Sequence, residues 1–463
     1  MKLSEILAGK PPEHHIPGAR SQIRQSLIDS GKRLAVIEDD PTGTQTVHGV
    51  NIFMTWSVAM LRKAIASGAI FFISTNSRSL SPDEARRISY EVGRNLREAT
   101  SKEGTGILLA SRSDSTLRGH FPYEVDALTS GLKMKPDGII IAPAFFEAGR
   151  YTIDDIQWVE QGGELVPVHE TEYARDPVFG FKNSNMKAWV TEKMGGTVNG
   201  EDVWSISLDL LRENGPQEVA ERLLAASNGR PIIVNAAGYD DLEVMALGII
   251  EAEKKGKSFV YRCAASFLKA RGGFEDKPFL TYKDLNTARG PGLIIVGSYV
   301  EKTSNQLKQL LASGLAYGIE LRVSELHNLD SRQTEVESVA NAVNEKLAAG
   351  VTTVVYTSRK LHITPGQNFQ EFGKYILQSL CEVVGRTQVR PAYLIAKGST
   401  TGFELARNAL NNEQALVLGQ IISGVPVLRL GAGARWANLP YIVFPGNVGD
   451  ENALCKVVET FPQ

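Results

Sequence analysis

Polar and charged residues gather at the ends of four apolar runs in the first third of the chain. The runs cover residues 33–39, 69–75, 105–111 and 137–143, and each is typical of a buried strand. The residues at their ends are Asp39, Asp40, Thr42 and Gly43; Asn76, Ser77 and Arg78; Asp114, Ser115, Thr116 and Arg118; and Gly149 and Arg150. Carboxylates accept hydrogen bonds from hydroxyl groups, and guanidinium groups form paired bonds with carboxylates. The set therefore favours a small polyhydroxy acid as ligand.

An alternative interpretation of these residues is structural. Asp-Pro, Asn-Ser and Asp-Ser are common in turns and helix caps, so any one of the loops could serve only to turn the chain. Four such loops at corresponding strand ends favour a binding site, because ligands of open α/β sheets bind outside the carboxyl ends of the strands. Successive strand residues point to opposite faces, so we expect different roles for Asp39 and Asp40.

The second half of the chain carries small polar residues and glycines at strand-to-helix junctions. Backbone N–H groups at the start of a helix form an anion site, which phosphate groups use. Ser and Thr are also ordinary helix caps, so each junction alone is a weak indication, and no G-x-x-x-x-G-K-[ST] loop occurs. The candidates for phosphate binding are Ser298, Gly398, Ser399, Thr400, Thr401, Gly446 and Asn447.

Alternating apolar runs and amphipathic segments must position these residues. They predict an α/β fold of two domains, each with a mostly parallel sheet flanked by helices, with an active-site cleft between them. The turn-rich stretch 274–292 interrupts the alternation, so we place the domains at residues 1–280 and 281–463. Residues 144–200 fit neither period, and we expect them to cover the cleft.

Composition excludes several classes of function. The formal net charge is −2, which argues against nucleic acid as a partner. No segment approaches the length of a membrane span, and only three cysteines occur, so we expect a cytoplasmic protein. The seven histidines show no zinc-binding spacing, and we predict no residues that ligate a metal.

With these motifs in place, the chain resembles the four-carbon acid sugar kinase family over nearly its whole length. "DDPTGTQ", "SDSTLRGH" and "PAFFEAGRYT" are similar to the family's DD-x-TG, DSTLRG and PAF-x-x-GR-T motifs. "KGSTTGFELARNAL" and "FPGNVGD" resemble its ATP loop and its C-terminal glycine-rich element. The chain departs from the family pattern at Arg112, Val300 and Ser399–Thr400, where the family often has Lys, Ser and Gly-Asp or Gly-Glu.

The resemblance implies a sugar-acid-binding domain at 1–280, an ATP-binding domain at 281–463, and phosphorylation of a substrate hydroxyl with ATP and Mg²⁺. The partners implied are a small acid sugar and, in a homodimer, a second copy of the chain. We expect Arg78, Arg118 and Arg150 to hold the substrate carboxylate. One of Asp40, Asp39 and Asp114 would accept the hydroxyl proton, with Asp40 the first choice.

The substrate remains open between linear tetronates, their 3-oxo forms and branched acids such as 3-oxo-isoapionate. Two further alternatives are a nicotinamide-dependent oxidoreductase of small hydroxy acids and a non-catalytic sugar-acid-binding protein. No G-x-G-x-x-G follows the first strand, which argues against the oxidoreductase.

Overall fold

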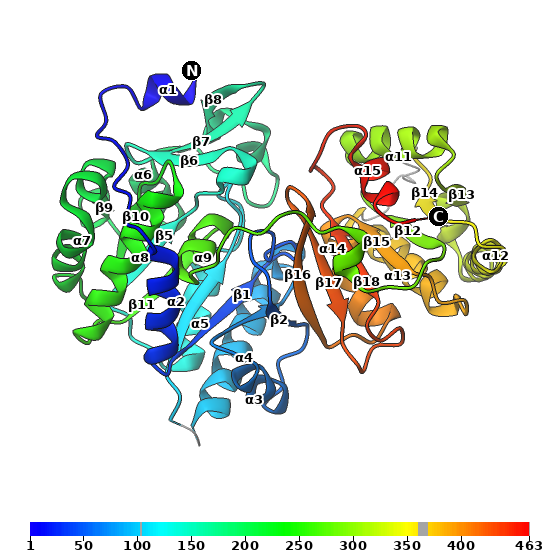
Figure 1. The fold of residues 1–463 in the computed structure, drawn as a ribbon, viewed down its shortest axis with the longest axis horizontal. Helices are drawn as coiled ribbons and strands as arrows, with labels where there is room; N and C mark the ends of the chain where they lie inside the picture. Colours follow the sequence, from blue (N-terminus) through cyan, green and yellow to red (C-terminus); the bar gives the residue numbers. More distant parts are fainter. Residues whose placement is uncertain (102–103, 360–368, 463) are drawn as a thin grey trace. The chain divides into compact units, whose positions relative to one another are not determined.

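A computed structural model describes residues 1–101, 104–359 and 369–462. These residues form two compact units, Met1–Asp276 (unit 1) and Lys277–Gln463 (unit 2). Each unit contains a mostly parallel sheet with helices packed on it (Figure 1), so the predicted α/β fold class is confirmed. Among the described residues, no helix is long and apolar enough to cross a membrane.

The sheet of unit 1 is parallel throughout its described pairings, in the order β2-β3-β1-β4-β11-β5-β10-β9. Its strands are β1 (Arg33–Glu38), β2 (Val50–Phe53), β3 (Ile70–Ser74), β4 (Ile107–Arg112), β5 (Gly138–Ala142), β9 (Trp204–Ile206), β10 (Arg230–Val234) and β11 (Phe259–Cys263). The sequence pattern does not predict strand β11, because Arg262 interrupts its apolar residues. In the sheet, β11 nevertheless lies between β4 and β5.

Helices surround this sheet and supply its hydrophobic core. They are α1 (Leu3–Ile6), α2 (Ala19–Asp29), α3 (Val58–Ala66), α4 (Pro82–Thr100), α5 (Tyr123–Leu132), α6 (Met186–Lys193), α7 (Gly215–Leu224), α8 (Tyr239–Lys254) and α9 (Ala265–Arg271). Leu96 of α4 and Leu128 of α5 pack with Ile37 and Phe71 of the strands in one buried cluster. Burial of such side chains, at about 25 cal/mol per Å² of apolar area, drives this packing.

Local sequence signals set the start of α4. The hydroxyl of Ser81 accepts from the backbone N–H of Glu84 at 3.4 Å, and the Glu84 carboxylate accepts from the backbone N–H of Ser81 at 3.1 Å. With Pro82 in the first turn, this capping box is the arrangement that the sequence predicts. It places the preceding loop, which carries Arg78, at the end of β3.

Residues 144–200 contain a small antiparallel sheet instead of a further parallel unit. Its strands are β6 (Arg150–Ile153), β7 (Ile156–Gln161) and β8 (Glu164–Pro167), in the order β6-β7-β8. Gly149, with a φ of 68°, makes the turn into β6, where an added Cβ would lie 2.6 Å from Cβ of Glu160.

Unit 2 has a parallel sheet with an antiparallel edge, in the order β13-β14-β12-β15-β18-β17-β16. Its strands are β12 (Gly292–Val296), β13 (Tyr317–Leu321), β14 (Thr353–Thr357), β15 (Tyr393–Lys397), β16 (Gln414–Ile422), β17 (Val425–Leu430) and β18 (Pro440–Phe444). The helices are α10 (Tyr282–Leu285), α11 (Glu301–Ser313), α12 (Leu329–Ala348), α13 (Phe369–Arg386), α14 (Ser399–Glu404) and α15 (Ala453–Glu459). Adjacent strands β12, β15 and β18 therefore end at one edge.

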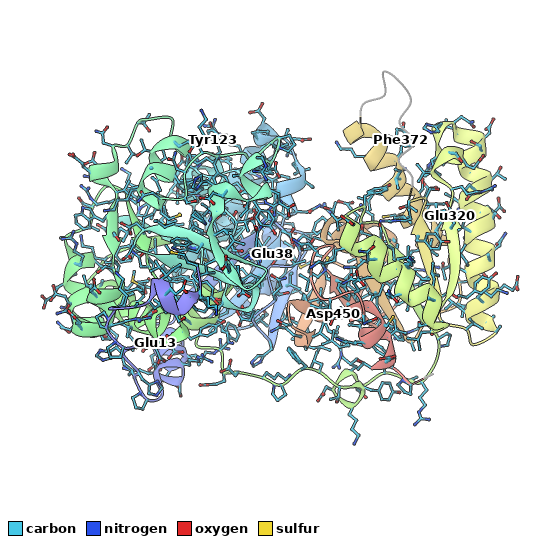
Figure 2. The ribbon with its side chains drawn as sticks, turned by 90° about the horizontal axis from the view of Figure 1, so that it is seen from above. Glu13, Glu38, Tyr123, Glu320, Phe372 and Asp450 are labelled. Atoms are coloured by element: carbon cyan, nitrogen blue, oxygen red, sulfur yellow. The ribbon has the colours of Figure 1, made fainter. Side chains whose placement is uncertain are left out.

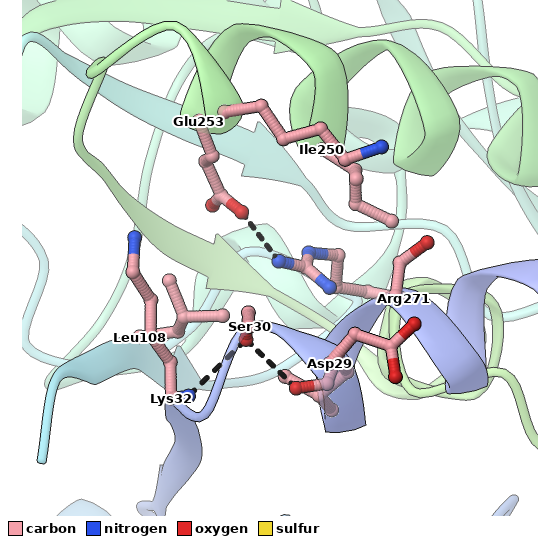
Figure 3. Close-up of a pocket in the computed structure, with 10 residues that line it drawn as sticks. Asp29, Ser30, Lys32, Leu108, Ile250, Glu253 and Arg271 are labelled. Atoms are coloured by element: carbon pink, nitrogen blue, oxygen red, sulfur yellow. Dashed lines mark hydrogen bonds and ion pairs between the residues drawn. The ribbon is translucent and has the colours of Figure 1, made fainter.

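A cavity of about 410 Å³ opens at the other end of the strands of unit 1 (Figure 3). Lys32, before β1, and Leu108, at the start of β4, line it together with Arg271, whose guanidinium donates to Glu253 at 2.8 Å. None of the site residues predicted from the sequence lines this cavity.

Candidate active site

The loop after β1 is folded around the side chain of Asp40. Oδ1 of Asp40 accepts hydrogen bonds from the backbone N–H of Thr42 at 2.9 Å and from its hydroxyl at 2.5 Å. An aspartate that accepts from the amide two residues later forms an Asx turn. The N–H of Gly43 then donates to the Asp40 carbonyl at 3.0 Å. The sequence Asp-Pro-Thr-Gly thus fixes the loop that carries Asp40.

Arg78 binds both aspartates of this loop. Its Nη2 and Nε donate to the two carboxylate oxygens of Asp39 at 2.5 and 3.1 Å, and Nη1 lies 3.4 Å from Oδ2 of Asp40. Asn76, with a left-handed φ of 52°, turns the chain into the 3₁₀ helix Ser77–Ser79 that positions Arg78. Paired bonds of this kind hold both the arginine and Asp39 in a defined orientation.

The two aspartates differ in burial. The Asp39 side chain is 3% exposed and that of Asp40 is 17% exposed. Burial opposes ionisation of Asp40, but Arg78, Arg112 and the hydrogen bonds from Thr42 outweigh it and hold its pKa below its usual range. Asp40 is therefore an ionised and accessible carboxylate.

The loop after β4 repeats this arrangement with another aspartate and arginine. Nε of Arg118 donates to Oδ2 of Asp114 at 2.7 Å, and the Thr116 hydroxyl donates to the same oxygen. Burial raises the pKa of Asp114, but Arg118, Arg78 and the hydrogen bonds reverse this effect and lower it strongly. Arg118 also lies over the ring of Tyr173, 5.0 Å from its centroid.

Ser113 connects the two loops. Its hydroxyl donates to Oδ2 of Asp39 at 2.8 Å and lies 3.3 Å from the carbonyl of Arg118. At Gly119, with a φ of 119°, an added Cβ would lie 2.6 Å from the Ser113 hydroxyl and 3.1 Å from Oδ2 of Asp39. The close approach of these groups requires glycine in the DSTLRG motif. Asp39, Asp40, Arg78, Asp114 and Arg118 therefore belong to one connected cluster.

The remaining predicted residues of unit 1 contribute differently. Ser115 is buried and its carbonyl accepts from Gln157 at 2.8 Å, and Asn76 and Gly149 set backbone turns. Nη1 of Arg150 donates to the carbonyl of Ala148 at 2.5 Å. In the described residues, no hydrogen bond or ion pair joins Arg150 to the cluster around Arg78 and Arg118.

Buried charged residues that the sequence motifs do not indicate complete this cluster. Arg262 of β11 is 1% exposed, and its guanidinium reaches the carbonyls of Asp114 and Arg118 at 3.3 and 3.4 Å. Glu124 of α5 accepts a hydrogen bond from the Ser77 hydroxyl. Burial, with the nearby charge of Asp39, raises the pKa of Glu124 to about 7. The available signal for Arg262 was one charge inside an apolar run.

In unit 2 the residues predicted to bind the nucleotide lie together at the ends of β12, β15 and β18. The Thr303 hydroxyl donates to the Gly446 carbonyl at 2.8 Å and lies 3.1 Å from Oγ of Ser298. An added Cβ on Gly446 would lie 2.6 Å from Oγ of Ser298, and one on Gly398 would lie 3.1 Å from Oγ1 of Thr401. These glycines let three backbone segments meet closely.

The other predicted residues of unit 2 lie at the edge of this group. Ser399 and Thr400 are half-buried in the first turn of α14, and Asn447 is exposed. Helix α14 is short and continues into the π-helix Leu405–Ala409.

Two basic residues that the sequence motifs do not indicate lie beside these residues. Nη2 of Arg359, after β14, donates to the Ser298 carbonyl at 2.7 Å and to Oγ of Ser304 at 2.9 Å. Its Nη1 is buried and has no hydrogen-bond partner among the described residues. Lys397 is fully buried, donates to the Pro445 carbonyl at 2.6 Å, and has its pKa lowered by burial to about 7.

Two family models match this chain. The model described as a sugar-binding N-terminal domain matches residues 34–271, and the model described as a nucleotide-binding C-terminal domain matches residues 293–454. The chain belongs to the four-carbon acid sugar kinase family. The family resemblance predicted from the sequence motifs is therefore confirmed, and the two clusters lie in the parts that the sugar-binding and nucleotide-binding models match.

Similar proteins include two named kinases. A D-erythronate kinase of Heliobacterium modesticaldum is 26% identical over 415 residues, which cover 84% of this chain and 86% of that protein. A D-threonate kinase of Bordetella bronchiseptica is 23% identical over 449 residues, which cover 93% and 97%. The fold is similar to that of a Haemophilus influenzae protein described by a domain of unknown function, with a TM-score of 0.63, 19% identity and coverage of 92% and 100%.

Proposed function

We propose that this protein is an ATP-dependent kinase that phosphorylates a hydroxyl group of a small acid sugar in the catabolism of carbohydrate acids. The observation that carries the proposal is the cluster of Asp39, Asp40, Asp114, Arg78 and Arg118 at the strand ends of unit 1. Family membership supports a kinase, and the names of the two relatives support a four-carbon acid as the class of substrate.

The cluster supplies both kinds of group that an acid sugar needs. Arg78 binds Asp39 and Asp40, and Arg118 binds Asp114, which fixes the orientation of both guanidinium groups. Each guanidinium has five N–H donors, so some remain for a substrate carboxylate. Arg150 is the third residue predicted to bind the substrate carboxylate. To do so, its guanidinium would release the carbonyl of Ala148, to which it donates in this structure. The candidate substrates are a tetronate, a 3-oxo-tetronate or a branched acid of the 3-oxo-isoapionate type.

Asp40 is the proposed acceptor of the hydroxyl proton. It is more exposed than Asp39, and both of its oxygens are oriented, one by Thr42 and one by Arg78. Its lowered pKa makes it a weak base. A weak base is compatible with phosphoryl transfer, because the transition state is loose and catalysis depends mostly on positioning and charge stabilisation.

The ends of β12, β15 and β18 are the proposed site for the ATP phosphates. The glycines Gly398 and Gly446 let the adjacent loops approach closely without side chains. Nη1 of Arg359, which has no hydrogen-bond partner among the described residues, adds a cationic donor. Arginine forks match the geometry of phosphate oxygens. Ser298, Ser399, Thr400, Thr401 and Asn447 are the remaining proposed contacts.

Mg²⁺ is expected to enter together with ATP. In the described parts of the chain, no group of three or more His, Cys, Asp or Glu side chains is arranged to hold a metal ion. Proteins usually bind Mg²⁺ through one or two carboxylates and substrate phosphates instead of an all-protein cage, so the proposal does not require such a group. When bound, the ion would neutralise charge on the phosphates.

Analysis of the reaction product tests the proposal. The protein is incubated with Mg-ATP and each candidate acid sugar, and the mixture is examined by ³¹P NMR and mass spectrometry. A new phosphate ester together with ADP is expected. Binding of an acid sugar without ester formation would favour a non-catalytic binding protein, and oxidation of the acid with NAD would favour the oxidoreductase.

A further inference from the structure

Glu38, the last residue of β1, is a fully buried carboxyl group beneath the loop that carries Asp39 and Asp40. Its side chain is 0% exposed and lies inside unit 1 (Figure 2). In the parallel register Glu38 pairs with Ser74 of β3 and with Arg112 of β4. Residues that pair directly in adjacent strands point to the same face of a sheet, so these three side chains share one face.

The carboxyl group has no hydrogen-bond partner in the part of the chain that the structure describes. Both Oε1 and Oε2 of Glu38 are unpaired, and so are the hydroxyls of Ser74 and Thr44 and the Nε of Arg112. An ionised carboxylate in such a place would be costly, because the neighbouring Ser74 hydroxyl and Arg112 compensate only in part for the loss of water. Burial is the main cause that raises the pKa of Glu38 to about 8. Asp40 and Asp39 act in the same direction, and the Ser74 hydroxyl and Arg112 act against it.

The acidic loop lies directly on this carboxyl group. An added Cβ on Gly43 would lie 2.0 Å from Oε2 of Glu38, so the backbone at Gly43 is in contact with Glu38. The N–H of Gly43 closes the turn of Asp40. The position of Asp40 therefore depends on the Glu38 carboxyl group that lies against Gly43.

We propose that Glu38 is a positioning residue whose carboxyl group, kept uncharged beneath Gly43, holds the Asp39–Gly43 loop in the conformation that presents Asp40 to the acid sugar. This inference rests on the proposed function for the role of Asp40. Ionisation of Glu38 would place a third negative charge beside Asp39 and Asp40, with Arg112 as the facing cation, and would disturb the loop.

Substitution of Glu38 tests the role in activity. Glu38→Ala removes the support, and we expect kcat/KM for the acid sugar to fall about tenfold or more at pH 7, whereas Glu38→Gln, an uncharged group of the same shape, restores most of it. A carboxyl with a pKa of about 8 is about nine-tenths ionised at pH 9, so the unmodified protein should lose about tenfold in kcat/KM there. Glu38→Gln should lack this loss.

Glu98→Gln, at an exposed carboxyl group on α4, is the matched control and should keep the alkaline loss. An equal alkaline loss in Glu38→Gln and the unmodified protein would contradict the proposal. The proposal would also be wrong if Glu38→Gln were folded and as impaired as Glu38→Ala.

Thermal unfolding tests the uncharged state without any substrate. Between its ordinary pKa of 4.5 and the raised value of about 8, the unfolded chain has lost the Glu38 proton that the folded protein keeps. The stability of the unmodified protein therefore falls relative to Glu38→Gln as pH rises through this range. We expect the Tm of Glu38→Gln minus that of the unmodified protein to grow from about pH 5 to about pH 8.

A difference in Tm that does not change with pH would show that Glu38 is ionised in the folded protein, and would overturn the inference. If the unmodified protein phosphorylates no acid sugar, the proposed function fails, while the unfolding comparison still decides the state of Glu38.

Discussion

Asp39 and Asp40 are neighbours in the chain, yet they have different surroundings. Asp39 is nearly buried, with paired bonds from Arg78 and a further bond from Ser113. Asp40 shares Arg78 at a longer distance and keeps more contact with solvent. These surroundings support the proposal that Asp39 has a structural role and Asp40 a chemical role.

Asp40→Asn should lower kcat about 100-fold or more while leaving KM for ATP near that of the unmodified protein, because general-base groups typically contribute 10²–10⁴-fold. Asp39→Asn, the comparison variant, should instead destabilise unit 1 by about 3 kcal/mol, since it removes one partner of a buried ion pair. Steady-state kinetics and thermal unfolding of both variants check this difference. Near-normal kcat in a folded Asp40→Asn protein would remove Asp40 from the mechanism.

We expect substitution of Arg359 to change the binding of ATP most clearly. Arg359→Ala should raise KM for ATP about tenfold, because a hydrogen bond to a charged group contributes about 1.5–3 kcal/mol, and should leave KM for the acid sugar near its original value. Arg390→Ala, at an exposed arginine that donates to the Ala437 carbonyl, is the control. An equal rise in KM for ATP in both variants would contradict a contact between Arg359 and the phosphates.

Buried charges were the least predictable residues of both clusters. Glu38 and Lys397 are the last residues of β1 and β15, and Arg262 is the last residue but one of β11, where the pattern predicts only burial. Their roles depend on partners from distant segments, such as the Pro445 carbonyl for Lys397. A single charge at the carboxyl end of a buried run is nevertheless a usable signal, because such a charge requires a partner or a shifted pKa.

At the scale of elements, most buried strands were predictable from the sequence, whereas the order in which the strands pair was less so. The observed β1, β3 and β5 lie within the apolar runs 33–39, 69–75 and 137–143 that predict strands, and β4 extends one residue beyond the run 105–111. The short strand β2, the edge strand β13 and the central β11 lack a clear apolar run, so tertiary pairing determines them. The neighbouring order of β12, β15 and β18, which brings Ser298, Gly398 and Gly446 together, is also set by long-range pairing.

The loop after β18 offers a test of this packing. Gly446→Ala places a Cβ 2.6 Å from Oγ of Ser298 and 3.3 Å from Cγ2 of Val300, so the loop or Ser298 must move. Overpacking of this kind costs about 1–3 kcal/mol, and we expect KM for ATP to rise about tenfold.

Gly433→Ala is the matched control in unit 2, because no atom lies within 4 Å of the added Cβ. Its KM for ATP should equal that of the unmodified protein. If both alanine variants bound ATP equally well, the close approach at Gly446 would not matter for the nucleotide.

At the scale of the whole molecule, each unit carries one half of the proposed chemistry. Unit 1, Met1–Asp276, holds the aspartate and arginine cluster, and unit 2, Lys277–Gln463, holds the glycine-bounded strand ends. The sequence placed the boundary after residue 280 from turn-forming residues, and the compact units divide after Asp276. The identity of the acid sugar is not encoded in a motif, because isomers that differ in one hydroxyl position are distinguished by the shape of the site.

The most direct test of the kinase assignment is ADP release with Mg-ATP, measured by a coupled assay across threonates, erythronates, their 3-oxo forms and 3-oxo-isoapionate. The account predicts strong turnover with at least one of these acids and little ADP formation when no acid is present. A folded protein that binds ATP but releases no ADP with any member of the panel would contradict it.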